Sequence, residues 1–186
     1  PIVRIGWADL ILTKRALDLG AAGIMFPYIQ TRAEAEHAVS FMQYPHQGIR
    51  GLSAGSRCSD YGASFQEYRG MANEHVVCIT QIETAQGVEN AADIAGVSRV
   101  EVLFVGPLDL SANLNTPKQF DDPSFVNALR HVSDSAGAKG KAAGILVQTQ
   151  EQVALCKELG FTFIAIGTDA GAVIKTFLAN VKQAKK

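Results

Sequence analysis

The sequence is poor in the residues that mark special environments. Its three cysteines, Cys58, Cys78 and Cys156, are far apart and form no CxxC pair, which is typical of free thiols in the reducing cytoplasm and excludes a disulfide scaffold. No run of about 18 apolar residues occurs, so we expect no membrane-spanning helix. No secretory signal peptide is recognisable. The net charge of −1 gives no reason to expect a nucleic-acid or membrane partner.

What remains is an ordinary globular composition. The chain has 186 residues, of which 47% are hydrophobic, and this suits a single domain, 1–186, with a substantial core. It begins with Pro1 instead of Met, so we expect a processed or trimmed chain, or a fragment.

Two hydrophobic periods alternate along the chain. Nearly continuous apolar runs are typical of strands buried on both faces, as in a parallel sheet covered by helices. These runs are 2–5, 23–29, 76–83, 100–106, 142–147 and 163–167. Helices are predicted between and after them, over 9–19, 65–74, 84 to about 95, 123 to about 135 and about 170–184, with one of about ten residues beginning at Thr31 and another beginning at Thr149. Pairs of Thr or Ser with Glu or Gln three residues later predict capping boxes at Thr31, Ser64 and Thr149.

Alternating strands and helices predict right-handed βαβ units. A (β/α)₈ barrel needs eight such units and typically about 250 residues, whereas six are found here. The periodicity fits an open doubly wound sheet and equally a barrel that lacks its first quarter. One connection, 44–62, is long and rich in Gly and Ser, which is typical of a functional or mobile loop.

Polar residues gather where the predicted strands end, which is where α/β folds place their chemistry. Gln81 and Glu83 lie two residues apart and therefore point the same way. Asp109 follows the next strand, and neighbouring strands are about 4.8 Å apart. The two carboxylates suit a hard cation, Mg²⁺ or Mn²⁺. The alternative is that each acid merely favours the first turn of the following helix.

Arg4 is unusual because it lies within a predicted strand. A buried guanidinium needs an anionic or carbonyl partner, so Arg4 is either a ligand-binding residue or one half of a structural ion pair. The four histidines, His37, His46, His75 and His131, are expected at the surface rather than in catalysis.

Seven segments together resemble the HpcH/HpaI aldolase family of class II, metal-dependent pyruvate aldolases. They are "IVRIGWAD", "TKRALDLGAAGIMFPYIQTRAEAEHAV", "YPHQGIRG", "QIET", "FVGPLDLSANL", "GKAAGIL" and "FIAIGTDAG". The resemblance spans the whole chain and implies a (β/α)₈ barrel. It also implies an aldolase that joins pyruvate to an aldehyde, or cleaves the resulting 2-keto-4-hydroxy acid, with a divalent metal as cofactor.

The resemblance implies roles for particular residues. Glu83 and Asp109 match the two metal-binding carboxylates, and Gln81 matches a glutamine beside the metal. Arg4 matches the arginine that contacts the keto oxygen of pyruvate. The backbone N–H groups around Leu108 and Asp109 match those that receive the pyruvate carboxylate, and Arg57 matches a loop arginine near the active site.

One part of the family pattern has no counterpart. The general-base histidine of the family precedes the segment "VRIG", so the sequence resembles an aldolase barrel lacking its N-terminal quarter. Two alternatives to the aldolase interpretation follow. One is a catalytically incompetent chain that retains assembly or metal binding, and the other is an acyl-CoA lyase of the citrate lyase β-subunit type.

The last predicted helix, 170–184, has an apolar stripe. Its members are Val173, Ile174, Phe177, Leu178 and Val181. It packs either on its own barrel or on a neighbouring subunit, as in the hexamers of the resembled family. We therefore expect a homo-oligomer.

Overall fold

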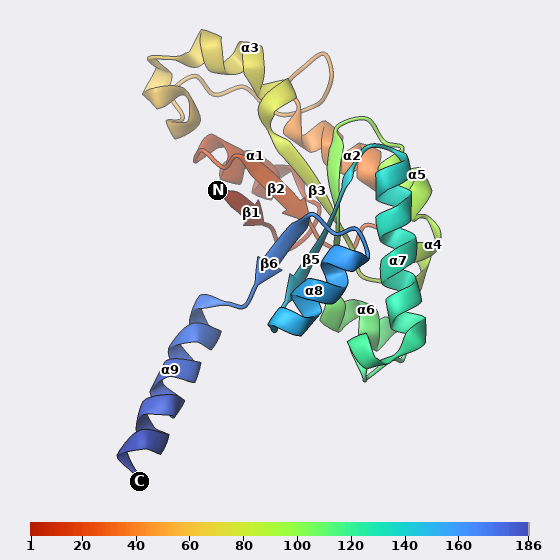
Figure 1. The fold of residues 1–186 in the computed structure, drawn as a ribbon. Coiled ribbons are helices and arrows are strands. Elements are labelled where there is room, and N and C mark those ends of the chain that lie inside the picture. The colour runs from red at the N-terminus through yellow and green to blue at the C-terminus, as the bar shows by residue number, and fades with distance from the viewer. Residues whose placement is uncertain (186) are drawn as a thin grey trace.

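The computed structural model describes residues 1–185, which form one parallel sheet with helices around it (Figure 1). The six strands lie side by side in chain order. They are β1 (Ile2–Arg4), β2 (Gly23–Phe26), β3 (Val77–Ile82), β4 (Val100–Val105), β5 (Ala142–Val147) and β6 (Phe163–Ile166). Each predicted strand is present, several of them shorter by one to three residues. Sequential parallel order is that of a barrel and not of a doubly wound sheet, in which the order reverses.

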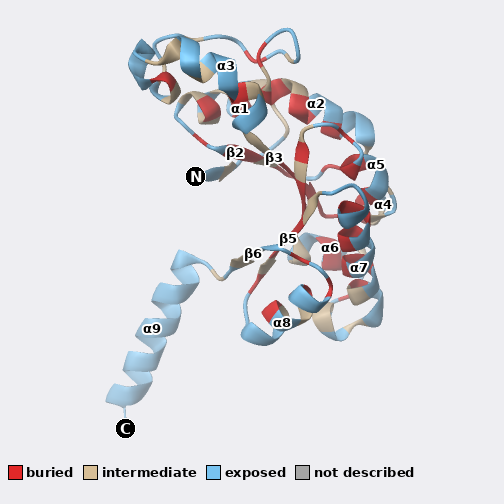
Figure 2. Ribbon diagram, turned by 45° about the horizontal axis from the view of Figure 1, so that its top comes forward, coloured by how far each residue is buried: buried red, intermediate tan, exposed pale blue. Residues whose placement is uncertain are grey.

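The sheet curls into an incomplete α/β barrel, with β1 and β6 at its two edges (Figure 2). Most helices pack on its outer face. The helices of residues 1–185 are α1 (Leu10–Asp18), α2 (Arg32–Met42), α3 (Phe65–His75), α4 (Ala85–Glu89), α5 (Ala91–Ala95), α6 (Pro107–Asn113), α7 (Pro123–Ala138), α8 (Gln150–Glu158) and α9 (Asp169–Ala184). Two short 3₁₀ helices, η1 (Arg57–Gly62) and η2 (Gln119–Asp121), lie in the longer connections.

The two faces of the sheet carry different side chains. The outer face forms the main core with the helices, where Ile24, Leu103 and Val105 are fully buried. The inner face has a smaller apolar cluster centred on Ile79 and Phe104. Because side chains alternate along a strand, the polar residues that follow Ile79 at intervals of two also reach the inner face.

The helix ends confirm two predicted caps and correct a third. Thr31 and Thr149 both form capping boxes. Ser64 precedes α3 but makes no side-chain cap. The single helix predicted over 84–95 is divided at Asn90, whose side-chain amide donates to the carbonyl oxygen of Gln30 at 2.8 Å. The backbone of Asn90 departs from helical geometry, with φ of −90° and ψ of 7°, although its N–H still donates to the carbonyl oxygen of Gln86.

Helix α9 projects away from the rest of the chain (Figures 1 and 2). None of its residues is buried, and the five apolar residues of its predicted stripe are among the most exposed large side chains of the protein. Packing of this stripe on its own sheet, one of the two alternatives, is therefore not observed. None of the helices within residues 1–185 is long and apolar enough to cross a bilayer.

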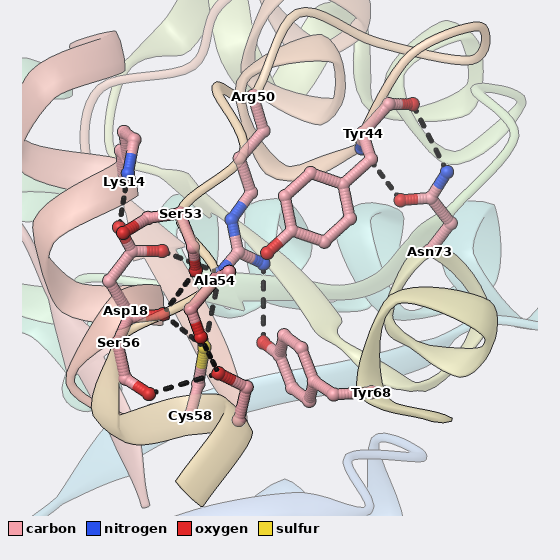
Figure 3. A network of polar contacts seen from close by, with 11 residues as sticks. Lys14, Asp18, Tyr44, Arg50, Ser53, Ala54, Ser56, Cys58, Tyr68 and Asn73 are labelled. Atoms are coloured by element: carbon pink, nitrogen blue, oxygen red, sulfur yellow. Dashed lines mark hydrogen bonds and ion pairs between the residues drawn. The ribbon is translucent and has the colours of Figure 1, made fainter. Parts of the chain in front are cut away.

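The long connection 44–62 is anchored by a completely buried arginine (Figure 3). Arg50 donates to Asp18 of α1 at 2.9 Å and to the hydroxyl of Tyr68 of α3 at 3.2 Å. Its guanidinium also lies 4.4 Å from the ring centroid of Tyr44. Asp18 is paired with Lys14 as well. The loop whose composition predicts function or mobility is thus fixed to α1 and α3 at its centre.

Arg50→Met is expected to lower the free energy of unfolding by about 2 kcal/mol, because it removes the buried hydrogen bonds to Asp18 and Tyr68 and leaves Asp18 with Lys14 as its remaining partner. Urea unfolding followed by circular dichroism measures this. The matched control is Arg57→Met, an exposed arginine of the same loop, with an expected change within about 0.5 kcal/mol. Equal effects of the two substitutions would contradict a structural role for Arg50.

Candidate active site

Arg4 and Gln81 meet on the inner face of the sheet. The Arg4 Nε donates to the Gln81 side-chain oxygen at 2.8 Å, across the intervening strand β2. Arg4 lies on edge strand β1 and is exposed, although we expected a buried guanidinium. Among residues 1–185 it forms no ion pair, so the structural ion-pair alternative has no support from this chain. The neutral amide orients Arg4 without neutralising it.

Glu83 follows β3 and is only 3% exposed. Its Oε2 accepts a hydrogen bond from the backbone N–H of Tyr28 at 2.9 Å. Its Oε1 faces Gly106, the residue after β4, so closely that a Cβ there would lie 2.5 Å away. A side chain at position 106 would therefore displace this carboxylate, which explains the glycine.

Burial and neighbouring charged groups both change the pKa of the Glu83 carboxyl. Burial raises the pKa of its carboxyl above the ordinary value of 4.5, and the nearby Asp109 carboxylate raises it further. The Tyr28 N–H and the Arg4 guanidinium act in the opposite direction. Glu83, Asp109 and Arg4 are thus electrostatic neighbours. A buried carboxylate beside a second one is a natural ligand for a divalent cation, which relieves the repulsion.

The donor set fits a hard cation with few protein ligands. Within residues 1–185 no group of three or more His, Cys, Asp or Glu side chains is placed to hold a metal. Two carboxylates are nevertheless enough for Mg²⁺, which keeps several waters and is bound through one or two carboxylates together with substrate oxygens. Neither a structural zinc site nor a calcium cage fits these residues.

The raised pKa predicts an unusual pH dependence for the metal-free chain. The pKa of Glu83 is higher in the folded chain than in the unfolded one. The contribution of this carboxyl to the free energy of unfolding is therefore most favourable below about pH 4.5. That contribution is lost as the pH rises through the folded pKa. We expect Glu83→Gln to be more thermostable than the wild type near pH 7 in EDTA. The difference should shrink as the pH falls toward 4. A difference that grows on acidification would contradict this sign.

Asp109 lies in the first turn of α6 and is exposed. The helix begins at Pro107, in keeping with the preference of proline for the first turn. Leu108, which precedes Asp109, is 74% exposed. Asp109 thus lies in the first turn of a helix, as the alternative interpretation expected. It is also close enough to Glu83 to affect the pKa of that carboxyl.

Arg57 lies elsewhere. It begins η1 and borders an open hollow of about 690 Å³ beside β1 and α1, together with Cys58 and Leu12. No hydrogen bond or ion pair within residues 1–185 joins it to Glu83 or Asp109. A site role for Arg57 stays a prediction, without support from its position in this chain. The four histidines are all exposed, as expected.

Sequence reasoning missed Tyr28 as part of the site. Its backbone has φ of 60°, in the left-handed region that few non-glycine residues adopt. This conformation turns its N–H toward Glu83. Strained backbone is enriched at functional sites, but the segment "FPYIQ" has no glycine or asparagine that would have signalled it.

The family follows from comparison with known proteins. The sequence profile described as HpcH/HpaI aldolase/citrate lyase matches residues 1–176. The chain belongs to this family. A 5-keto-4-deoxy-D-glucarate aldolase of Shigella boydii serotype 18 is 36% identical over 171 residues, which are 92% of this chain and 66% of that protein.

Two solved structures agree with the observed fold. A family protein from Burkholderia cenocepacia J2315 is 31% identical, with a TM-score of 0.94 over all of this chain and 74% of that one. The citrate synthase SbnG is 30% identical, with a TM-score of 0.84 over all of this chain and 71% of that one. The chain thus spans slightly less than two thirds of the curated relatives it matches, and between two thirds and three quarters of these two solved chains.

Proposed function

We propose that this chain carries those residues of a class II aldolase site that bind the divalent metal and pyruvate. The observation that carries the proposal is the convergence of Glu83, Asp109, Arg4 and Gln81 from β3, β4 and β1 at one end of the inner face. The aldolase relative supports the reaction class, a carbon–carbon lyase acting on a 2-keto acid.

Each residue has a distinct role in this proposal. Glu83 and Asp109 hold the divalent cation, Mg²⁺ or Mn²⁺, which when bound supplies a positive charge for the substrate oxygens. Arg4, fixed by Gln81, donates to the keto oxygen of pyruvate and stabilises the negative charge that develops there in the enolate. The N–H groups of Leu108 and Asp109, in the unpaired first turn of α6, receive the pyruvate carboxylate. We assign no general base among residues 1–185.

Arg4→Lys is expected to lower metal-dependent exchange of the pyruvate methyl protons with deuterium by about 10²-fold, because the planar fork that donates to both Gln81 and substrate is lost. Proton NMR of pyruvate in D₂O with Mg²⁺ measures the rate. Arg15→Lys, on α1, is the matched control with an expected unchanged rate. Wild-type exchange by Arg4→Lys would contradict the assigned role.

We also propose that α9 packs on a neighbouring copy of this chain. The support is its exposed apolar stripe and its separation from the rest of the chain. The acyl-CoA lyase alternative has no particular support here, since no long basic segment suited to coenzyme A occurs in the sequence.

A further inference from the structure

The segment that carries Tyr28 is bound to strand β3 and to the residue that follows it. The Tyr28 N–H donates to Oε2 of Glu83 at 2.9 Å, and the next N–H, that of Ile29, donates to the carbonyl oxygen of Gln81 at 3.1 Å. Tyr28 has φ of 60°, a conformation that costs free energy and persists only where surrounding contacts impose it. The contacts that impose it therefore bear on how Glu83 is held.

Thr84 makes the first of these contacts. It is 3% exposed, and its hydroxyl donates to the side-chain oxygen of Gln30 at 3.0 Å. The same hydroxyl accepts from the Gly87 N–H at 3.0 Å, as the N-cap of α4. A Cβ at Gly87 would lie 3.1 Å from the Ile29 carbonyl oxygen, so the first turn of α4 lies directly against the segment. One buried hydroxyl thus connects α4 with the residue two positions after Tyr28.

Asn90 makes the second contact, at the point where α4 ends and α5 begins. Its side-chain amide donates to the Gln30 carbonyl oxygen at 2.8 Å. On the side of α2, the Gln30 N–H donates to Glu34 at 2.7 Å. Thr84, Gln30 and Asn90, here called the Thr84 clamp, therefore fix the chain immediately after Tyr28.

The two carboxylate oxygens of Glu83 have different surroundings. Oε2 accepts from the Tyr28 N–H, whereas Oε1 faces Gly106, the residue between β4 and the helix that carries Asp109. A carboxylate that is hydrogen-bonded at one oxygen presents the other in a fixed direction. Oε1 is therefore directed toward the strand end that leads to the second carboxylate.

We propose that the Thr84 clamp positions the Tyr28 N–H on Oε2 of Glu83, and that Oε1 is thereby made the oxygen that the divalent cation binds. This inference rests on the function proposed above. The clamp residues contact neither metal nor substrate in this proposal, and they act through Tyr28 as positioning residues. Removal of a hydrogen-bond partner that orients a metal ligand typically lowers metal affinity by about 10- to 100-fold.

Selective labelling reports the clamp in the metal-free chain. The sequence has four tyrosines, so protein made with ¹⁵N-labelled tyrosine gives four backbone amide peaks, and Tyr28→Phe identifies the peak of Tyr28. Thr84→Val removes the hydroxyl but nearly conserves the shape of the side chain. We expect the Tyr28 proton resonance to move upfield, because its hydrogen bond to a carboxylate weakens. Its exchange with solvent should become about tenfold faster.

Mn²⁺ affinity measures the consequence for the site. Titration followed by electron paramagnetic resonance should give a dissociation constant about tenfold higher for Thr84→Val than for the wild type. Thr84→Ser keeps the hydroxyl and should restore both the Tyr28 peak and the Mn²⁺ affinity. Asn90→Leu removes the other bond of the clamp, leaves the N-cap of α4 in place, and should change both readouts in the same direction as Thr84→Val.

Thr149→Val is the matched control. Thr149 is the N-cap of α8 and follows β5 as Thr84 follows β3, and its hydroxyl also accepts from a backbone N–H of the first turn. The substitution should lower thermal stability through loss of the cap. It should leave the Tyr28 peak and the Mn²⁺ affinity unchanged. If Thr84 were only the cap of α4, Thr84→Val would give this same result.

The outcomes separate this inference from the proposed function. A Tyr28 peak that stays in place in Thr84→Val would overturn the inference, and so would wild-type Mn²⁺ affinity in a variant whose Tyr28 peak has moved. If Thr84→Val does not fold, Asn90→Leu decides by the same criteria. Failure of the proposed function has a different signature, namely no Mn²⁺ binding by the wild-type chain although its Tyr28 peak responds to the clamp substitutions.

Discussion

Asp109→Asn and Glu83→Gln are each expected to lower Mg²⁺-dependent exchange of the pyruvate methyl protons by about 10³-fold. Either change removes one of the two carboxylates assigned to the cation, and with it the positive charge that stabilises the enolate. The substitutions conserve shape and keep an oxygen that can accept hydrogen bonds. Folding should therefore survive, and Glu83→Gln should even be stabilised near pH 7, because it removes a buried charge.

Glu151→Gln is the matched control for Asp109. Like Asp109, Glu151 is an acid in the first turn of a helix that follows a strand, but nothing assigns it to the site. Proton NMR of pyruvate in D₂O compares the three variants with the wild type. If Asp109→Asn exchanged pyruvate as fast as Glu151→Gln, Asp109 would be only a favourable first-turn acid of α6.

The second large effect concerns assembly. Phe177→Glu combined with Leu178→Glu is expected to convert an oligomer into a chain that sediments as a monomer of about 20 kDa. Burying a Phe or Leu side chain contributes about 1.5–3 kcal/mol, and a charge in the same interface costs more than that gain. Analytical ultracentrifugation at micromolar concentration measures the change.

A double substitution on the opposite side of α9 provides the control. Lys175→Glu with Gln183→Glu alters charge on the same helix but avoids the apolar stripe, and the oligomer should persist. A wild-type chain that is already a sharp monomer at these concentrations would show that α9 has no partner copy.

The strands of the parallel sheet could be predicted because each is a compact apolar run. Side chains on both faces of the sheet are buried, as shown by Ile79 and Phe104 on the inner face and Leu103 on the outer face. The strands therefore show no alternation of apolar and polar residues, which is typical of a parallel sheet. Periodicity could not choose between a barrel and an open sheet. Strand order made that choice, since it depends on contacts between distant segments.

Parts of the site were predictable for a simple geometric reason. Side chains two residues apart on a strand share a face, and this alternation alone places Gln81 and Glu83 together. The exposed position of Arg4 was not predictable, because it depends on β1 being at the edge of the sheet.

Two further features depend on tertiary structure that no local pattern encodes. The positive φ of Tyr28 is stabilised by its hydrogen bond to a residue 55 positions away. Arg50 and Arg57 look alike in a polar loop, yet one is completely buried against Asp18 and the other is exposed. Burial of that kind depends on how α1, α3 and the loop meet.

Direct titration with Mn²⁺ tests the central claim, that Glu83 and Asp109 together hold a divalent cation to which pyruvate binds. Electron paramagnetic resonance counts free and bound Mn²⁺ on the wild-type chain and on the Glu83→Gln/Asp109→Asn double variant, with and without pyruvate. We predict one site per chain in the wild type, tightened by pyruvate, and its loss in the double variant. Equal Mn²⁺ binding by the two proteins would contradict the account.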